Sequence, residues 1–237
     1  MPTIATATKP GSRNANDKDA DRVHHGNFAS NLEFLSRVRP IRKQAKLLEI
    51  GSGTGSMLAH LCEQGYDAVG IEINQDQVDR ALAAHPGLPI QLADGGLIPF
   101  EDNSFDVVAS FDVFEHIPDS DVHLGEVARV LKPGGRYLLQ SPNKWTNSIF
   151  ETIRWKSLTK WREDHCSLHS YFQFKRRFKK HNFDITFVEV PIVTDYFLKK
   201  IKLYLGRPGV AAVKVAQPDR WPKPMRTNFY IEATLRG

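Results

Sequence analysis

Cysteines and long apolar segments are scarce in this sequence. Its 237 residues include two cysteines, Cys62 and Cys166, which lie far apart. No apolar run approaches the roughly 20 residues that span a bilayer, and the first residues lack the apolar core of a secretory signal peptide. A secreted domain held by disulfides and an integral membrane protein are therefore disfavoured, and we predict a cytoplasmic protein with reduced thiols.

Apolar residues are also sparse at the start of the chain. Residues 1–21 are rich in Asn, Asp, Pro and Gly, and we expect residues 1–27 to be disordered. The whole chain is 41% hydrophobic, which is enough for one good core. We therefore predict one domain over residues 28–237.

The net charge of +5 hides three segments of different sign. Residues 1–46 carry nine Lys and Arg against four Asp and Glu, a net +5. Residues 47–142 carry four against fifteen, a net −11, and residues 143–237 carry nineteen against eight, a net +11. An acidic centre between basic ends indicates two surfaces with different partners, although unevenly spread solubilising charge would give the same counts.

Strand-like and helix-like apolar patterns alternate along the chain. Strands that alternate with helices of this length predict an α/β, Rossmann-like doubly wound sheet that is mostly parallel. The expected strands are Lys46–Ile50, Ala68–Ile73, Ile90–Ala93, Asp106–Ser110, Arg136–Gln140, Ile185–Val193 and Asn228–Leu235. The expected helices are Phe28–Val38, Ser56–Gln64, Gln75–Ala84, Asp121–Leu131 and Tyr171–Lys180, with an irregular Lys- and Pro-rich segment before the last strand.

The stretch LLEIGSGTGSML ends the first expected strand in a glycine loop, at the sheet edge where doubly wound folds bind ligands. Gly51, Gly53 and Gly55 follow G-x-G-x-G rather than the G-x-G-x-x-G of dinucleotide sites. Glu49 precedes the loop, and like charges repel, so an ammonium group suits this position better than a pyrophosphate. Glu72, at the end of the second strand, could accept hydrogen bonds from both hydroxyls of a ribose.

An ammonium group, a ribose and a base together describe S-adenosylmethionine, whose positive sulfonium also suits the acidic centre of the chain. The alternative is a structural glycine turn with acids nearby by chance.

Five segments in order then resemble a known family: LLEIGSGTG, GIEIN, LADGGLIPFEDNSFDVV, DVFEHI and LKPGGRYLLQSPN. They look like the successive motifs of class I S-adenosylmethionine-dependent methyltransferases, and are most similar to the type-11 branch that includes ubiquinone-biosynthesis O-methyltransferases. The resemblance covers about Leu47 to Asn143 closely and the final strands loosely. It implies a seven-stranded sheet whose last strand is antiparallel, with basic lid insertions at about 143–182 and 195–226.

The resemblance also implies S-adenosyl-L-methionine as the cofactor. The motif Asp94-Gly95-Gly96 departs from the family pattern, which reads Asp-Ala-Glu or similar. The implied cofactor contacts are Glu49, Gly51, Ser52, Gly53, Gly55, Glu72, Ile73, Asp94, Gly95, Ser110 and Phe111.

His116, just past the fourth expected strand, is the leading candidate for a catalytic base, with Glu115 as its neighbour. A sulfonium is a good leaving group, so positioning of the acceptor does much of the work, but a hydroxyl acceptor must also lose a proton. His116 could instead begin or cap the turn before Pro118.

His165 and His169 lie four residues apart with Cys166 between them, a spacing that could hold a metal on a helix. The sequence offers no convincing third ligand, so we predict no metal. By the family resemblance, the segment after the fifth strand covers the substrate. The candidate substrate contacts are Asn143, Trp145, His165 and His169.

Basic and aromatic residues gather in the predicted lid. Ile149, Phe150, Ile153, Leu158 and Trp161 recur at roughly helical spacing, with Arg and Lys largely elsewhere around the helix. Such a helix suits an anionic membrane surface or a nucleic acid, or it is an ordinary lid helix whose apolar stripe packs on the sheet.

These patterns predict an S-adenosylmethionine-dependent methyltransferase that modifies a small-molecule, lipid-intermediate or glycan acceptor at oxygen. The alternatives are a nucleic-acid or protein methyltransferase that uses the basic face, a catalytically silent S-adenosylmethionine-binding module, and a nicotinamide oxidoreductase. We expect a cytoplasmic enzyme with a reversible contact to an anionic membrane, and the sequence does not predict its oligomeric state.

Overall fold

The computed structural model describes residues 28–157, 159 and 165–237. The expected disorder of residues 1–27 therefore lies outside the described residues. So do Leu158 and Trp161 of the predicted lid stripe.

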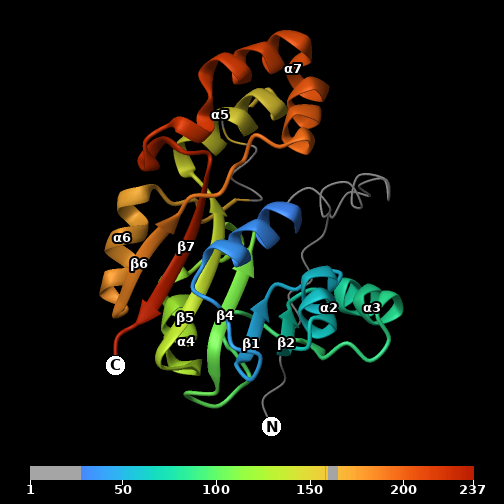
Figure 1. The fold of residues 1–237 in the computed structure, drawn as a ribbon, viewed down its shortest axis with the longest axis vertical. Helices are drawn as coiled ribbons and strands as arrows, with labels where there is room; N and C mark the ends of the chain where they lie inside the picture. The colour runs from blue at the N-terminus through green and yellow to red at the C-terminus, as the bar shows by residue number, and fades with distance from the viewer. Residues whose placement is uncertain (1–27, 158, 160–164) are drawn as a thin grey trace.

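Seven strands form one sheet in the order β3-β2-β1-β4-β5-β7-β6 (Figure 1). Their bounds are β1 Lys46–Ile50, β2 Asp67–Glu72, β3 Ile90–Leu92, β4 Phe105–Phe111, β5 Leu131–Pro142, β6 Phe183–Val188 and β7 Asn228–Leu235. β1 to β5 pair in parallel, whereas β7 pairs antiparallel with both β5 and β6. The predicted α/β fold with an antiparallel last strand is confirmed.

Helices cover both faces of this sheet, which explains why its central strands read as continuous apolar runs. In β1, Leu47 and Leu48 are both buried but pack into two different cores, one on each face. Phe34, from a helix over residues 28–37, fills the first of these cores beside Leu47. Phe174 and Phe178 fill the second.

The helices begin where the sequence supplies capping side chains. The Asn74 side chain accepts from the amide of Asp76 at the start of α3 (Gln75–Ala84), and Asp119 caps α4 (Ser120–Val130). Ser170 and Gln173 form a capping box at the start of α6 (Tyr171–Lys180). With α2 (Ser56–Glu63), these helices lie within about one residue of their expected bounds.

β6 is shorter than the expected strand, which ran to Val193. It ends at Val188 because Pro191 has no amide to donate and the next two amides are used elsewhere. The amides of Ile192 and Val193 donate to the Asp219 carboxylate at 2.8 and 3.2 Å.

Two helices, α5 (Lys144–Trp155) and α7 (Asp195–Ala216), lie together beyond the carboxyl ends of the parallel strands (Figure 1). The sequence predicted an irregular segment in place of α7. A kink at Gly206 (φ 65°, ψ −165°), two residues before Pro208, joins two helical halves there. Short turns η3 (Pro218–Arg220) and η4 (Lys223–Met225) follow. None of the helices in the described residues is long and apolar enough to cross a membrane.

Candidate active site

The loop between β1 and α2 requires glycine at three positions. Gly51, Gly53 and Gly55 have φ values of 73°, 53° and 79°, a region that L-residues rarely adopt. A Cβ on Gly51 would lie 2.2 Å from Cγ2 of Val113, and one on Gly55 would lie 2.4 Å from Cδ2 of Leu88. Residues 51–55 therefore form a bare backbone loop, the glycine cradle, which side chains would obstruct.

The Glu72 carboxylate joins this cradle to the end of β2. Its Oε2 accepts from the amide of Gly53 at 2.9 Å, and its Oε1 accepts from the amide of Asn74 at 3.0 Å. An ionised carboxylate has about four acceptor positions, so positions remain for the two hydroxyls of a ribose.

Glu49 is a buried carboxylate with an unsatisfied oxygen. Its side chain is buried, and Oε2 has no hydrogen-bond partner among the described residues. Burial raises the pKa of Glu49 to about 7, and the nearby Glu72 carboxylate adds to the effect. Ser52 lies beside it, with its hydroxyl 3.4 Å from the Glu49 carbonyl. A ligand ammonium group would complete this site, which is the fit that the amino-acid end of S-adenosylmethionine requires.

The loops after β2 and β3 present exposed apolar side chains. Ile73 is 68% exposed at the end of β2, and Leu97, which the sequence analysis did not single out, is 76% exposed. The Asp94 carboxylate accepts from the amide of Gly96 at 2.7 Å, which shapes the turn that contains Gly95. These positions suit the predicted contacts to an adenine ring.

A buried hydrogen-bond chain links this turn to the end of β4. Ser110 Oγ lies 2.7 Å from Tyr137 Oη, Tyr137 Oη lies 2.9 Å from His123 Nε2, and His123 Nδ1 lies 2.8 Å from the Gly95 carbonyl oxygen. Because a carbonyl can only accept, His123 donates to Gly95, Tyr137 donates to His123, and Ser110 donates to Tyr137. Burial lowers the pKa of His123 to about 4, which keeps the ring neutral.

This chain holds Gly95 and Ser110, two predicted cofactor contacts, in one rigid arrangement. The sequence analysis missed Tyr137 and His123, because a tyrosine inside a strand and a histidine on an apolar helix face resemble ordinary core residues. Phe111, the residue after Ser110, is half-buried and packs edge-on against Phe34, with ring centroids 6.5 Å apart.

Three side chains at the carboxyl end of β4 form an acid–histidine cluster: Glu115, His116 and His165. The first two belong to the turn η1 (Phe114–His116), and one ligand atom from each of the three lies within 4.8 Å of the others. The rings of His116 and His165 are 5.0 Å apart between centroids. Burial raises the pKa of Glu115 to about 8, Asp112 adds negative potential, and Ser141 Oγ donates to Glu115 at 3.0 Å.

The segment after residue 164 holds His165 in place. The amide of Ser167 donates to the Glu115 carbonyl at 2.9 Å, and Cys166 Sγ lies 3.4 Å from the His116 carbonyl. Asn147 of α5 places its Nδ2 3.2 Å from His165 Nδ1. Ser141 and Asn147 were not predicted, although Ser141 lies at the carboxyl end of a strand, the signal that identified Glu72.

Three predicted substrate contacts lie elsewhere. Asn143 is buried, and its amide donates to the carbonyls of Pro224 and Arg226, so it anchors the chain before β7. His169 is buried in the core against Phe114, with its Nδ1 2.6 Å from the Ser167 carbonyl. Trp145 is 63% exposed and lies two residues from Asn147, on the opposite side of α5 from His165.

The suggested pairing of His165 and His169 is therefore wrong, because residues 165–170 are not helical. In the described residues, the acid–histidine cluster is the group whose atoms could hold a metal ion. The prediction that this chain needs no metal remains a prediction.

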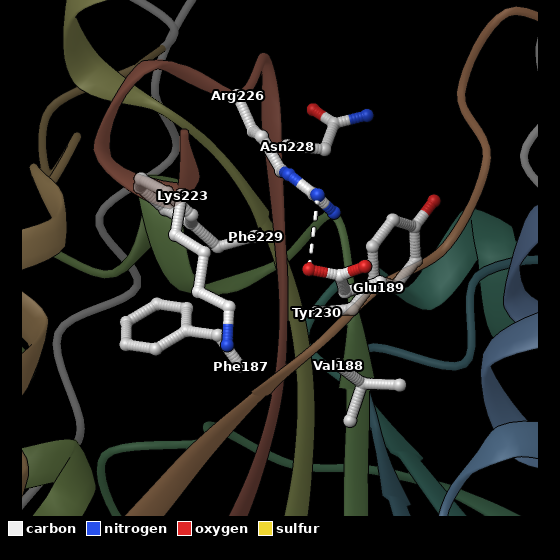
Figure 2. A pocket seen from close by; sticks show the side chains of 8 residues that line it. All are labelled: Phe187, Val188, Glu189, Lys223, Arg226, Asn228, Phe229 and Tyr230. Atoms are coloured by element: carbon white, nitrogen blue, oxygen red, sulfur yellow. Dashed lines mark ion pairs between the residues drawn. The ribbon is translucent and has the colours of Figure 1, made fainter. Parts of the chain in front are cut away.

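A small pocket at the junction of β6 and β7 is not part of this site (Figure 2). Arg226 and Glu189 form an ion pair of 3.1 Å within it, and Phe187 and Lys223 line it. β4 and β5 lie between this pocket and β1, which carries the glycine cradle.

Comparisons with known proteins identify the family. A protein-family model described as a methyltransferase domain matches residues 23–188. Tocopherol O-methyltransferase of Arabidopsis thaliana is 36% identical over 105 residues, which are 41% of this chain and 30% of that protein. Demethylmenaquinone methyltransferase of Streptomyces griseus is 30% identical over 112 residues, covering 47% of this chain and 49% of that one. The match therefore spans less than half of either curated relative.

Among solved structures, phosphoethanolamine N-methyltransferase 2 of Haemonchus contortus, in complex with S-adenosyl-L-methionine, superposes with a TM-score of 0.60 at 20% identity. The match covers 88% of this chain and 52% of that one, and at this identity it shows the fold alone. The finer resemblance to ubiquinone-biosynthesis O-methyltransferases stays a prediction. The matched family, together with the motif order, establishes that the chain belongs to the methyltransferase-domain family of class I fold and uses S-adenosylmethionine as its cofactor.

Proposed function

We propose that this enzyme transfers a methyl group to a hydroxyl oxygen of a small, largely apolar acceptor such as a lipid intermediate. The observation that carries the proposal is the acid–histidine cluster at the end of β4, beside Ser110 and the cofactor loops. A hydroxyl is a weak nucleophile until it loses its proton, and this cluster offers groups that can take one.

When bound, S-adenosylmethionine supplies a methyl group on a positively charged sulfur, which a nucleophile can displace. The cradle and Glu49 would hold the amino-acid end, and Glu72 would hold the ribose. Fixing donor and acceptor in line supplies much of the rate, because it removes the entropy cost of their encounter.

His116 is the exposed member of the cluster and can reach an acceptor, whereas Glu115 is buried behind it. As the acceptor oxygen attacks, its proton passes to His116. A cation within about 4–6 Å lowers a carboxyl pKa by about 1–3 units, so the protonated imidazole would favour ionisation of Glu115, whose raised pKa of about 8 keeps it protonated beforehand. The Glu115 proton then passes to solvent, and an imidazolium–carboxylate pair remains that holds the proton taken from the acceptor.

The named relatives support an apolar acceptor more than they support oxygen. One acts on tocopherol at oxygen and one on demethylmenaquinone, whereas the solved structure is an N-methyltransferase. We favour oxygen because a hydroxyl acceptor must lose a proton, and the acid–histidine cluster can accept it. A protein or nucleic-acid acceptor is the alternative, and the exposed basic residues of α6, Lys175, Arg176 and Lys179, are the surface that would serve it.

Incubation of the enzyme with methyl-labelled S-adenosylmethionine and a cell extract would test the proposal. We expect label in the organic-solvent fraction and a methyl ether in the mass spectrum of the product. His116→Asn should lower turnover at least tenfold without changing affinity for S-adenosylhomocysteine, while the control His85→Asn, at the half-buried end of α3 and outside the cluster, should change neither. Label that appears only in protein or RNA would contradict the proposal, and no label in any fraction would favour a silent binding module.

A further inference from the structure

The outer face of α5 carries a row of exposed apolar side chains. Trp145, Ile149 and Ile153 are 63%, 64% and 50% exposed and lie four residues apart, so they line one side of the helix. A contiguous apolar row of this kind on a surface marks a contact with another apolar surface.

The other side of α5 is already occupied. Asn147 contacts His165 of the acid–histidine cluster, Glu151 is buried, and Phe150 packs edge-on against Tyr204 of α7 with ring centroids 6.1 Å apart. Asn147 and Glu151 are each offset by two residues, about 200° around the helix, from members of the row. The row therefore lies on the side of α5 opposite Asn147 and Glu151, and so faces away from the acid–histidine cluster. The alternative in which an apolar stripe of this helix packs on the sheet does not fit Ile149 and Ile153, because both are exposed.

Positive charge borders this row at both ends. Lys144 places its Nζ 5.9 Å from the ring centroid of Trp145, and Lys156 is exposed at the end of α5. Glu151 is the single acidic residue of α5, and it is buried on the opposite side. The segment that contains these helices, residues 143–237, carries nineteen Lys and Arg against eight Asp and Glu.

We propose that the outer face of α5, made of Trp145, Ile149 and Ile153 with Lys144 and Lys156, docks on an anionic membrane surface. A Trp at the interface, aliphatic side chains in the acyl boundary and Lys at the headgroups are the pattern of helices that lie in a membrane surface. A stable protein dimer needs about 800 Å² per partner from 20–30 residues, which a single row of three side chains does not provide. The docking does not require a lipid acceptor, so it does not depend on the proposed function.

Sedimentation of the full chain with vesicles tests the docking directly. Phosphatidylcholine vesicles should bind little protein, and vesicles with phosphatidylglycerol should bind much more. Salt at 1 M shortens the Debye length from about 10 to about 3 Å, so it should release most of the bound protein. Binding that is equal on both lipids and unaffected by salt would overturn the anionic part of the proposal.

Two variants and one control assign the effect to α5. Ile149→Glu should weaken binding at least about tenfold, because it places a charge where docking would bury an apolar side chain in the membrane surface. Lys144→Glu should weaken it at least about fivefold, since each basic residue near the surface contributes about 1 kcal/mol. An acid in the first turn of a helix does not oppose its folding. Leu82→Glu on α3, at a site 39% exposed, is the matched control and should bind like the wild type.

Melting temperature and affinity for S-adenosylhomocysteine should stay unchanged in all three variants, which separates lost docking from lost folding. The proposal is overturned if anionic vesicles bind no protein at low salt. It is also overturned if Ile149→Glu abolishes a concentration-dependent dimer while vesicle binding is absent in the wild type. Methyl transfer to an acceptor in detergent does not depend on docking, so failure of one proposal leaves the other standing.

Discussion

Replacing Glu49 by Gln should stabilise the unliganded enzyme and weaken its binding of the cofactor product. Burial raises the pKa of Glu49 from 4.5 to about 7, so between these values the folded protein holds a proton that the unfolded chain has released. The free energy of unfolding therefore falls as pH rises through this window, by up to about 3 kcal/mol for a shift of this size. Gln does not ionise, so the variant does not lose this free energy of unfolding as pH rises. At pH 7.5 it should therefore melt at a higher temperature than the wild type.

Binding should change in the opposite direction. The ammonium group of S-adenosylhomocysteine requires ionised Glu49, but at pH 6 only about one molecule in ten has it ionised. Affinity should therefore rise about tenfold, or about 1.4 kcal/mol, between pH 6 and 7.5. At higher pH the α-amino group of the ligand loses its own proton, and the affinity should fall again.

Calorimetry at pH 6 in two buffers of different ionisation enthalpy would count the protons. Binding to the wild type should release close to one proton, and binding to Glu49→Gln should release none and be weaker. Glu63→Gln, at an exposed position on α2, is the control. A variant that melts lower than the wild type and binds with the same pH slope would refute the assignment of Glu49 to the ammonium group.

Three other outcomes follow from the site. Tyr137→Phe should cost about 1–3 kcal/mol in urea unfolding, because His123 and Ser110 lose a buried partner, and an unchanged midpoint would contradict the hydrogen-bond chain. Glu72→Ala should weaken S-adenosylhomocysteine binding by about 1.5–3 kcal/mol in calorimetry, and tight binding of NAD instead would contradict the cofactor site. Dialysis against EDTA should leave methyl transfer unchanged, and activity that zinc restores would make the acid–histidine cluster a metal centre.

The first half of the fold could be predicted because local signals agree with it. β1 and α3 have the bounds that the sequence predicted, since a buried strand leads into a glycine loop and Asn74 caps the helix. The segment that was expected to be irregular, where the structure has α7, contains Gly206 and Pro208, and each of these residue types usually ends a helix. In the structure they lie at a kink, and helical turns continue on both sides of it.

The candidate site was predictable only where position in the sheet marks a residue. Glu49 and Glu72 stand at the carboxyl end of strands, and the structure brings both to the glycine cradle. The partner of His116 was not predictable from spacing, because His165 reaches it through an irregular segment held by hydrogen bonds to η1. Trp145 is exposed because Asn147, two residues on, turns toward His165, and this contact was not predictable from spacing.

The placement of β7 between β5 and β6 also constrains how the chain folds. β7 is the last strand in the chain, but in the described structure it lies between β5 and β6. About 40 residues, which include α7, separate β6 from β7 along the chain. Before β7 pairs, the edge of β5 carries a row of unpaired amides and carbonyls. β6 cannot join the sheet either, because β7 is the strand with which it pairs. Closing a loop of this length costs entropy before any strand-pairing hydrogen bond forms, so completion of the sheet should be the slow step of folding. A nascent chain halted before Asn228 would present that open edge to other chains and to chaperones.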